Sequence, residues 1–167
     1  MDSNTTITPE EFTYFAKQFC EISNRLCDGW VFCKDKEIHR CYLKKDTFIS
    51  HEGENENTLL RAEFVIFYNL SYGVPSFSFN IWNSAGVLLT LEDIRTMSFI
   101  TIKREDFYSV ITQQEHPLFL RPYFVMHPCH TATLLATLKN KSKNIIVTFL
   151  SLITPLLRLK LPFEYGL

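Results

Sequence analysis

The chain has 167 residues, of which 46% are hydrophobic and 21% are charged, and it contains fifteen phenylalanines but only five glycines. This composition excludes a disordered or low-complexity chain, and the length suits a single domain over residues 1–167. The formal net charge is −1, so the protein has no strong field for nucleic acid phosphates or for an anionic membrane. We therefore expect no nucleic-acid partner.

The cysteine content and the first residues of the chain predict a reducing environment. Residues 1–6 are polar and lack the basic and apolar regions of a secretory signal, and the number of cysteines is odd. Both features favour free thiols and a cytoplasmic location. The spacing of the cysteines matches no common zinc module, so we expect no metal site. The cysteines are Cys20, Cys27, Cys33, Cys41 and Cys129.

The segment from Ile145 to Leu157 is apolar enough to be compared with a membrane span. It is interrupted by Pro155 and bounded by Lys143 and Arg158, and it covers only thirteen residues. A helix that crosses a bilayer needs about twenty apolar residues. We therefore predict a helix that faces the protein core, and no stable membrane insertion.

The first regular element is a helix that begins after Thr8. A capping threonine, a proline at the first helical position and Glu11 three residues after the cap are typical of a helix start. Asp28-Gly29 ends the pattern. The apolar residues between these points have the three-four spacing of one helical face: they are Phe12, Phe15, Phe19, Ile22 and Leu26.

Strands are predicted in the middle of the chain. Trp30–Lys34 and Ile38–Lys44 indicate a hairpin, whereas the polar stretch Lys45–Thr58 predicts an exposed loop. Leu59–Asn69 and Val74–Trp82 are stronger strand candidates. The second of them alternates apolar residues with serine and asparagine, which predicts one core face and one wetter face.

The second half of the chain predicts mainly helices. Thr90 caps a short helix, and another is expected over Glu105–Thr112. An extended run, Tyr123–His127, precedes a helix capped by Thr131, and a final amphipathic helix covers Asn144–Leu157. The order of helix, antiparallel meander and further helices indicates an α+β fold.

The most reactive cluster of the sequence is His127-Pro128-Cys129-His130-Thr131, at the predicted junction of strand and helix. A thiolate attacks acyl groups, and both a nearby imidazolium and a helix start favour that form. In an extended run His127 and Cys129 lie on the same side of the chain. The alternative without chemistry is that Cys129 is a small buried residue.

A second enzyme class remains open from the residues alone. A papain-like cysteine hydrolase would pair Cys129 with a distant histidine, and His39 and His116 are the candidates. His39 lies in the predicted hairpin without an evident partner. His116 follows polar residues in a predicted turn, which is either a solvated loop or part of a recognition surface.

Four stretches of the sequence resemble the autophagy-related protein 10 family. The most specific is ITQQEHPLFLRPYFVMHPCHT, in which ITQQEHP is followed by HPC. The resemblance implies a ubiquitin-conjugating-enzyme-like fold, with an antiparallel sheet of about four strands and a possible extra hairpin packed against helices. The four stretches are Ser71–Pro75, Gly86–Ile94, Ile111–Thr131 and Leu150–Tyr165.

The resemblance also implies an activity. The chain is expected to be a ubiquitin-like protein transferase that accepts autophagy-related protein 12 as a thioester on Cys129 from the activating enzyme autophagy-related protein 7. It would pass this modifier to a lysine of autophagy-related protein 5, without a cofactor, in support of autophagosome formation. A non-catalytic module that binds ubiquitin-like proteins is the remaining alternative, and the presence of Cys129 argues against it.

Ordinary ubiquitin-conjugating enzymes place a His-Pro-Asn motif several residues before their cysteine, and its asparagine helps to stabilise the charge that forms on the thioester carbonyl. Residues 119–126 contain no asparagine. Our hypothesis is that His127 and Tyr72 take over orientation, oxyanion stabilisation or deprotonation of the lysine. His130 either orients the thiolate, binds a partner or faces water.

Overall fold

A computed structural model describes residues 6–53 and 57–167, without the side chain of His130. Described helices, including 3-10 helices (η), and strands follow one another in the order α1 (Pro9–Leu26), β1 (Val31–Cys33), η1 (Ile38–Arg40), β2 (Tyr42–Glu52), β3 (Asn57–Asn69), β4 (Val74–Trp82), α2 (Leu91–Arg95), α3 (Phe107–Val110), β5 (Ile111–Glu115), β6 (Pro122–Met126), α4 (Cys129–Leu138), η2 (Lys139–Lys141), α5 (Ile145–Ile153), η3 (Thr154–Leu156) and η4 (Phe163–Gly166).

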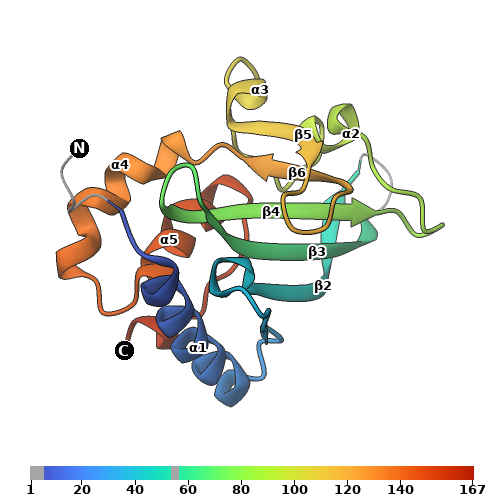
Figure 1. The fold of residues 1–167 in the computed structure, drawn as a ribbon. Helices are drawn as coiled ribbons and strands as arrows, with labels where there is room; N and C mark the ends of the chain where they lie inside the picture. The colour runs from blue at the N-terminus through green and yellow to red at the C-terminus, as the bar shows by residue number, and fades with distance from the viewer. Residues whose placement is uncertain (1–5, 54–56) are drawn as a thin grey trace.

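The strands form one antiparallel sheet with α1, α4 and α5 to one side of it (Figure 1). The order of its six strands is β1-β2-β3-β4-β6-β5, and each neighbouring pair is antiparallel. This arrangement confirms the predicted α+β fold. The expectation is about four strands with a possible extra hairpin, and the strand that the sequence did not predict is β5, at one edge of the sheet.

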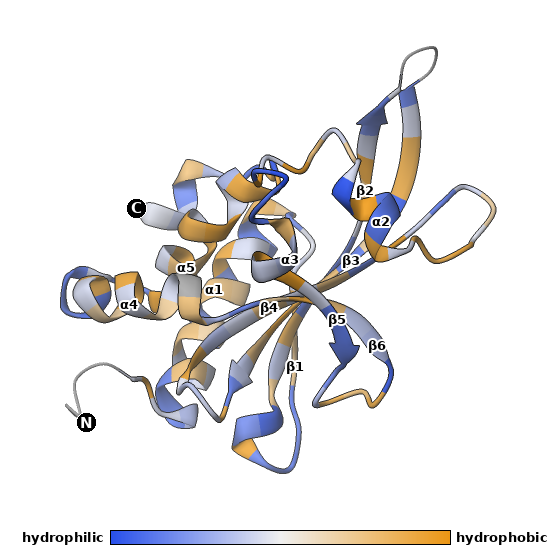
Figure 2. Cartoon of the chain, turned by 90° about the horizontal axis from the view of Figure 1, so that it is seen from above, coloured by the Kyte–Doolittle hydropathy of each residue, from blue (hydrophilic) through white to orange (hydrophobic). Residues whose placement is uncertain are grey.

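The main core lies between the sheet and the helices α1 and α5. Phe12 and Phe19 of α1 and Phe149 of α5 belong to the same hydrophobic cluster as Phe64 of β3 and Phe77 of β4. Hydrophobic residues are concentrated along the facing sides of these elements (Figure 2). The cluster is the main source of folding free energy because it removes large aromatic surfaces from water.

The predicted start of α1 is confirmed in detail. The Thr8 hydroxyl accepts a hydrogen bond from the Glu11 N–H at 3.1 Å, and the Glu11 carboxylate accepts one from the Thr8 N–H at 3.3 Å. This reciprocal pair satisfies two amides that a helix start leaves open. The helix ends where Cys27 adopts a left-handed conformation with φ 53°. Local sequence signals therefore set both ends of α1.

The expected loop over Lys45–Thr58 is wrong up to Glu52 and from Asn57, and residues 54–56 lie outside the described part of the chain. β2 continues to Glu52 and pairs with β3 up to Asn57, forming a hairpin that projects beyond the rest of the sheet (Figure 2). Non-local pairing overrides the polar composition, because each residue of β2 has a β3 partner for its main chain. The start of the expected strand Ile38–Lys44 is instead the turn η1, and the hairpin partner of β1 begins at Tyr42.

The wetter face predicted for β4 is buried. Ser76, Ser78 and Asn80 are all shielded from solvent, and His116 contacts Ser78 while the Asn80 side chain donates to the Pro122 carbonyl at 3.0 Å. A second, smaller cluster that includes Phe67 and Tyr123 lies on this face. Serine and asparagine in β4 therefore mark a polar buried face rather than a solvated one.

The helices of the second half are partly as predicted. Thr90 caps α2, and α5 buries one side of the expected final helix. The helix expected over Glu105–Thr112 is reduced to α3, because Ile111 and the residues after it pair with β6. No helix of the described part of the chain is long and apolar enough to cross a membrane.

The packing of Phe149 predicts a large loss of stability on truncation. Phe149→Ala should lower the free energy of unfolding by about 3–5 kcal/mol, because it leaves a cavity in the main core. Phe163, which is 76% exposed, provides the control, since its change to alanine should cost less than about 0.5 kcal/mol. Urea denaturation followed by tryptophan fluorescence measures both, and equal values would contradict this account of the core.

Candidate functional site

Cys129 lies at the predicted junction of strand and helix. It is the first residue of α4, three residues after β6 ends at Met126, and it is exposed to solvent. The two residues between Met126 and Cys129 are held in place, because the His127 N–H donates to the Val110 carbonyl at 2.8 Å and Pro128 is buried. The sulfur is therefore accessible although the backbone that carries it is held by the core.

The predicted cap at Thr131 is wrong, because α4 begins two residues earlier. The Pro128 carbonyl accepts the first helical hydrogen bond, from the Ala132 N–H at 2.9 Å. The Thr131 hydroxyl donates to the same carbonyl at 3.3 Å and caps nothing. Cys129 consequently sits in the first turn, where the helix dipole favours negative charge.

His127 contacts the backbone of Cys129. Its Nδ1 accepts a hydrogen bond from the Cys129 N–H at 3.3 Å. This bond requires an unprotonated Nδ1, so the neutral ring carries its proton on Nε2. The ring therefore presents a donor on the side away from the Cys129 amide.

Tyr72 completes the group of predicted residues that the fold brings together. It lies in the turn between β3 and β4, and its ring is 5.9 Å from the ring of His127 at an angle of 80°. Tyr72 is 42% exposed. An edge-to-face pair is a favourable aromatic arrangement, and here it joins two segments that are distant in sequence beside Cys129.

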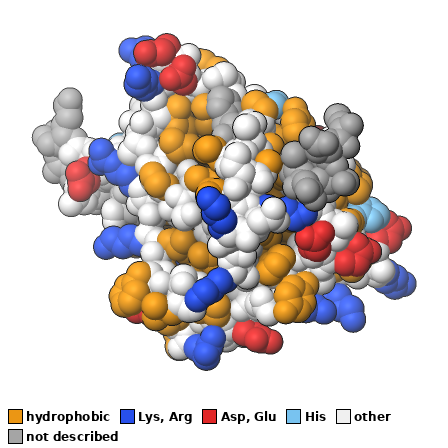
Figure 3. Space-filling model, turned by 90° about the vertical axis from the view of Figure 1, so that its left-hand side faces the viewer, with side chains coloured by type: hydrophobic (Ala, Val, Ile, Leu, Met, Phe, Trp, Pro, Cys, Tyr) orange, Lys and Arg blue, Asp and Glu red, His pale blue; other side chains and the backbone are white. Residues whose placement is uncertain are grey.

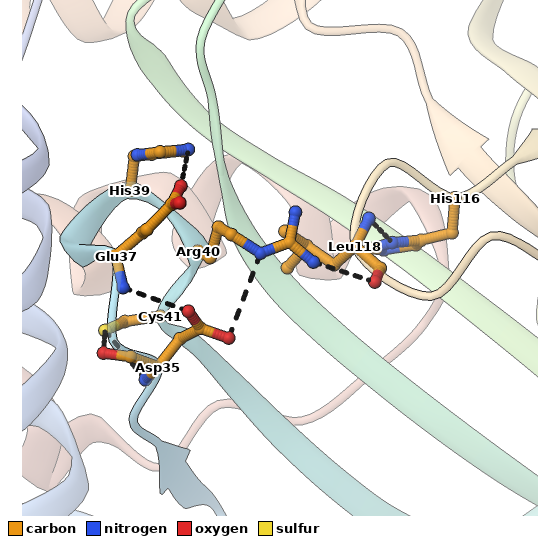
Figure 4. Close-up of polar contacts among 7 residues, drawn as sticks. All are labelled: Asp35, Glu37, His39, Arg40, Cys41, His116 and Leu118. Carbon is orange, nitrogen blue, oxygen red and sulfur yellow. Dashed lines mark hydrogen bonds and ion pairs between the residues drawn. The ribbon is translucent and has the colours of Figure 1, made fainter.

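His39 does not join this group. Its Nε2 lies 3.2 Å from the Glu37 carboxylate, within the turn between β1 and β2 (Figure 4). The sequence did not reveal a partner for His39, and the structure shows that this partner is Glu37 in the same turn. His39 has no geometric link to Cys129.

His116 is buried at the far end of the β5–β6 hairpin, so the expectation of a solvated loop or recognition surface is wrong. Glu115 pairs with Pro122 at that end, whereas Ile111 pairs with Met126 at the end next to Cys129. A five-residue strand separates the two ends, which corresponds to about 16 Å. The histidine pairing that a papain-like mechanism needs is not formed.

The His116 ring is engaged on both nitrogens. Its Nδ1 accepts from the Leu118 N–H at 3.1 Å, and its Nε2 lies 3.0 Å from the Ser78 hydroxyl. Arg40 donates to the carbonyl of the same Leu118, which ties this loop to the turn after β1 (Figure 4). The ring also stacks on Phe119 with centroids 4.4 Å apart. Burial, and then the charge of Arg121, lower the pKa of His116 to about 4.

The other candidate chemistries find no support in the described residues. All five cysteines are free thiols, and no cluster of three or more His, Cys, Asp or Glu residues suited to a metal ion occurs in the described part of the chain. On the face of the molecule to the left in Figure 1, hydrophobic side chains alternate with separate lysines and arginines (Figure 3). This mixture matches the small net charge and gives no extended basic surface.

A family model described as "Autophagocytosis associated protein, active-site domain" matches residues 3–164. The chain belongs to this family. Several relatives carry the name ubiquitin-like-conjugating enzyme ATG10. The human protein is 26% identical and covers 99% of this chain and 95% of its own length. The Arabidopsis thaliana protein is 30% identical and covers 73% of this chain and 61% of its own length.

These relatives place the chain in the ATG10 group, and the chain is accordingly a ubiquitin-like protein transferase. Among solved structures, "Solution structures of KmAtg10" matches with a TM-score of 0.49 and 17% identity, covering 91% of this chain and 95% of that one.

Sequence reasoning missed the contacts that hold the site in place. The Val110 carbonyl, which anchors His127, has no side-chain signal because any residue carries a main-chain oxygen. The burial of His116 did have a signal. Its partner Ser78 alternates with the core residues of β4 and therefore lies on the opposite face of the sheet. A second layer that covers this face can provide the hydrogen-bond partner that the Ser78 hydroxyl needs.

The depressed pKa of His116 predicts acid sensitivity. The unfolded chain binds a proton near the ordinary value of 6.5, whereas the folded ring does so only near about 4. The stabilisation is complete above pH 6.5 and is lost as the pH falls towards 4, by about 3 kcal/mol. His116→Gln removes this titration but leaves the carboxylates of the chain unchanged.

The difference in unfolding free energy between the wild type and His116→Gln, measured with urea at several pH values, isolates the effect. Between pH 7 and pH 4, the free energy of unfolding should fall by about 3 kcal/mol more for the wild type than for the variant. A difference that stays constant with pH would show that His116 is not buried in its neutral form.

Proposed function

We propose that Cys129 carries autophagy-related protein 12 as a thioester. It accepts this modifier from the activating enzyme autophagy-related protein 7 and passes it to a lysine of autophagy-related protein 5, in support of autophagosome formation. The observation that carries the proposal is the exposed sulfur of Cys129 at the start of α4, next to the paired rings of His127 and Tyr72. Membership of a family named for its active-site domain supports it.

The first half of the reaction is thioester exchange. The Cys129 thiolate attacks the carbonyl carbon of the modifier's terminal residue on the activating enzyme, a new S–C bond forms, and the old C–S bond breaks. The departing thiolate of the activating enzyme takes up the proton that Cys129 gave up. This step needs an accessible sulfur and an approach path for the modifier's tail, which the exposure of Cys129 supports.

The second half is aminolysis. The lysine nitrogen attacks the thioester carbonyl, an isopeptide bond forms, the S–C bond breaks, and a proton leaves the amine. The Cys129 thiolate that leaves takes up this proton, and we assign stabilisation of the oxyanion to His127 and Tyr72 together. The neutral His127 ring carries its donor on Nε2, and the Tyr72 phenol is a second donor at the partly exposed edge. No residue of this mechanism requires a cofactor.

Two further proposals concern the whole chain. Residues 1–167 form a single domain, which is supported by one hydrophobic cluster that reaches from Ile7 to Tyr165. The protein acts in the cytoplasm, where free thiols such as the five found here persist.

A non-reducing gel tests the thioester. With activating enzyme, modifier and ATP, the wild type should form a band that reducing agent removes, whereas Cys129→Ala should form none. Cys129→Ser should form an oxyester that survives the reducing agent, because a hydroxyl is a poorer leaving group than a thiol. Loss of the band on changing Cys41, which is buried, with retention in Cys129→Ala, would overturn the proposal and favour a different nucleophile.

The roles of His127 and Tyr72 predict a split between the two half-reactions. His127→Ala and Tyr72→Phe should load Cys129 at the rate of the wild type but transfer the modifier to the acceptor more slowly, by about 10²-fold. Single-turnover discharge of preloaded enzyme measures transfer alone. Tyr108→Phe, on an exposed tyrosine outside the site, is the matched control, and normal transfer by both site variants would refute the assignment.

A further inference from the structure

The segment just before α1 lies against the turn that carries Tyr72. The Ile7 N–H donates to the Gly73 carbonyl at 2.8 Å, and the Tyr68 hydroxyl donates to the Ile7 carbonyl at 2.7 Å. Ile7 itself is buried in the main core. Thr6, Ile7 and Thr8, which we call the N-terminal strap, are therefore anchored to β3 and to the turn that follows it.

The turn is also held from within. Asn69 accepts two hydrogen bonds, one on its carbonyl from the Gly73 N–H at 2.8 Å and one on its side chain from the Tyr72 N–H at 3.1 Å. Gly73 has a left-handed φ of +63°, which closes the turn. The Tyr72 backbone is thus fixed on both sides, although its ring is partly exposed.

The contact between strap and turn leaves no room for a side chain at position 73. A Cβ added to Gly73 would lie 2.8 Å from the Cβ of Thr6 and 3.0 Å from its Cγ2. Gly86 has a similar φ of +78° but nothing within 4 Å of its added Cβ. Both glycines have a left-handed φ, but only a Cβ added at Gly73 would contact the strap.

The strap also reaches the helix that begins with Cys129. The Lys139 ammonium, at the end of α4, donates to the Thr6 carbonyl at 2.7 Å and lies 3.7 Å from the Glu11 carboxylate. The strap therefore connects the Tyr72 turn with the distal end of α4. It spans the two elements that supply Tyr72 and Cys129.

We propose that the N-terminal strap is a positioning element that sets the Tyr72 ring against His127 for transfer of the modifier, and this inference rests on the proposed function. Loading needs only an accessible sulfur, so the strap should not affect it. Transfer depends on the placement of the Tyr72 phenol, and a displacement of about 1 Å at a reacting group can cost about 10²-fold in rate.

The test compares two glycine variants that carry the same backbone cost. Gly73→Ala should load Cys129 at the wild-type rate and discharge preloaded modifier to the acceptor at least about tenfold more slowly, because the added methyl pushes the turn away from Thr6. Gly86→Ala should load and discharge like the wild type. Thr6→Gly combined with Gly73→Ala removes the clashing Cβ and should restore much of the transfer rate.

Tyr68→Phe provides a second, more conservative variant in case Gly73→Ala does not fold. It removes the hydroxyl that holds the Ile7 carbonyl and keeps the aromatic packing, and it should slow transfer but not loading. In a Tyr72→Ala background, Gly73→Ala should have no further effect on transfer, because the group that the strap positions is already absent. A purely structural role would give additive losses.

The outcomes separate this inference from the function on which it rests. Absence of any Cys129-dependent thioester in the wild type would overturn the proposed function. If the wild type loads and transfers, the strap proposal is overturned when Gly73→Ala, or Tyr68→Phe if the first does not fold, transfers at the rate of Gly86→Ala. It is equally overturned when loading and transfer slow together, or when the loss persists in the Tyr72→Ala background.

Discussion

The pairing of β3 with β4 is the interaction on which the rest of the structure depends. These two strands are the centre of the sheet and are buried on both faces over residues 62–68 and 74–81, the main core lying on one face and the second cluster, with Phe67 and Tyr123, on the other. Their turn carries Tyr72, and β4 is the strand beside which β6 delivers Cys129. A ladder that is dry on both sides has a single favourable register, because a slip of one residue would exchange its two faces. The geometry of the site follows from that register.

Burial of both faces explains the composition of β4. Phe77, Phe79 and Ile81 belong to the main core, whereas Ser78 and Asn80 between them contact His116 and the Pro122 carbonyl. Small polar residues fit here because the covering loop comes close and provides hydrogen-bond partners. This loop lies away from Cys129, His127 and Tyr72. The face of the sheet that it covers therefore serves stability, whereas the ends of the strands carry the candidate reactive residues.

Sequence reasoning succeeded where local signals decide the structure. The capping box at Thr8, the alternation of β4 and the cap at Thr90 each act over a few residues, and the elements they predict are present. The hypothesis of a shared role requires Tyr72 to lie near His127, and the two rings are 5.9 Å apart. Their catalytic roles remain a prediction.

The failures have a common physical cause, which is contact between distant segments. The sequence of the outer part of β2 is typical of a polar loop, and this segment forms a strand because β3 pairs with it. His116 reads as solvated because the residues before it are polar, yet its ring is covered by Phe67, Phe119 and Tyr123. In both cases the partner lies elsewhere in the chain, and no periodicity within the segment reveals it.

The join between β4 and β6 has a consequence for the motions of the protein. It consists of two residue pairs, Ser78 with Val125 and Phe79 with Phe124, whereas the neighbouring β3–β4 ladder has nine. Short ladders are where native proteins open locally, at a free energy below that of complete unfolding. Such breathing would carry Cys129 and His127 away from Tyr72 while the hairpin of β3 and β4 stayed intact. The contact between Tyr72 and His127 therefore depends on a β4–β6 ladder of only two residue pairs.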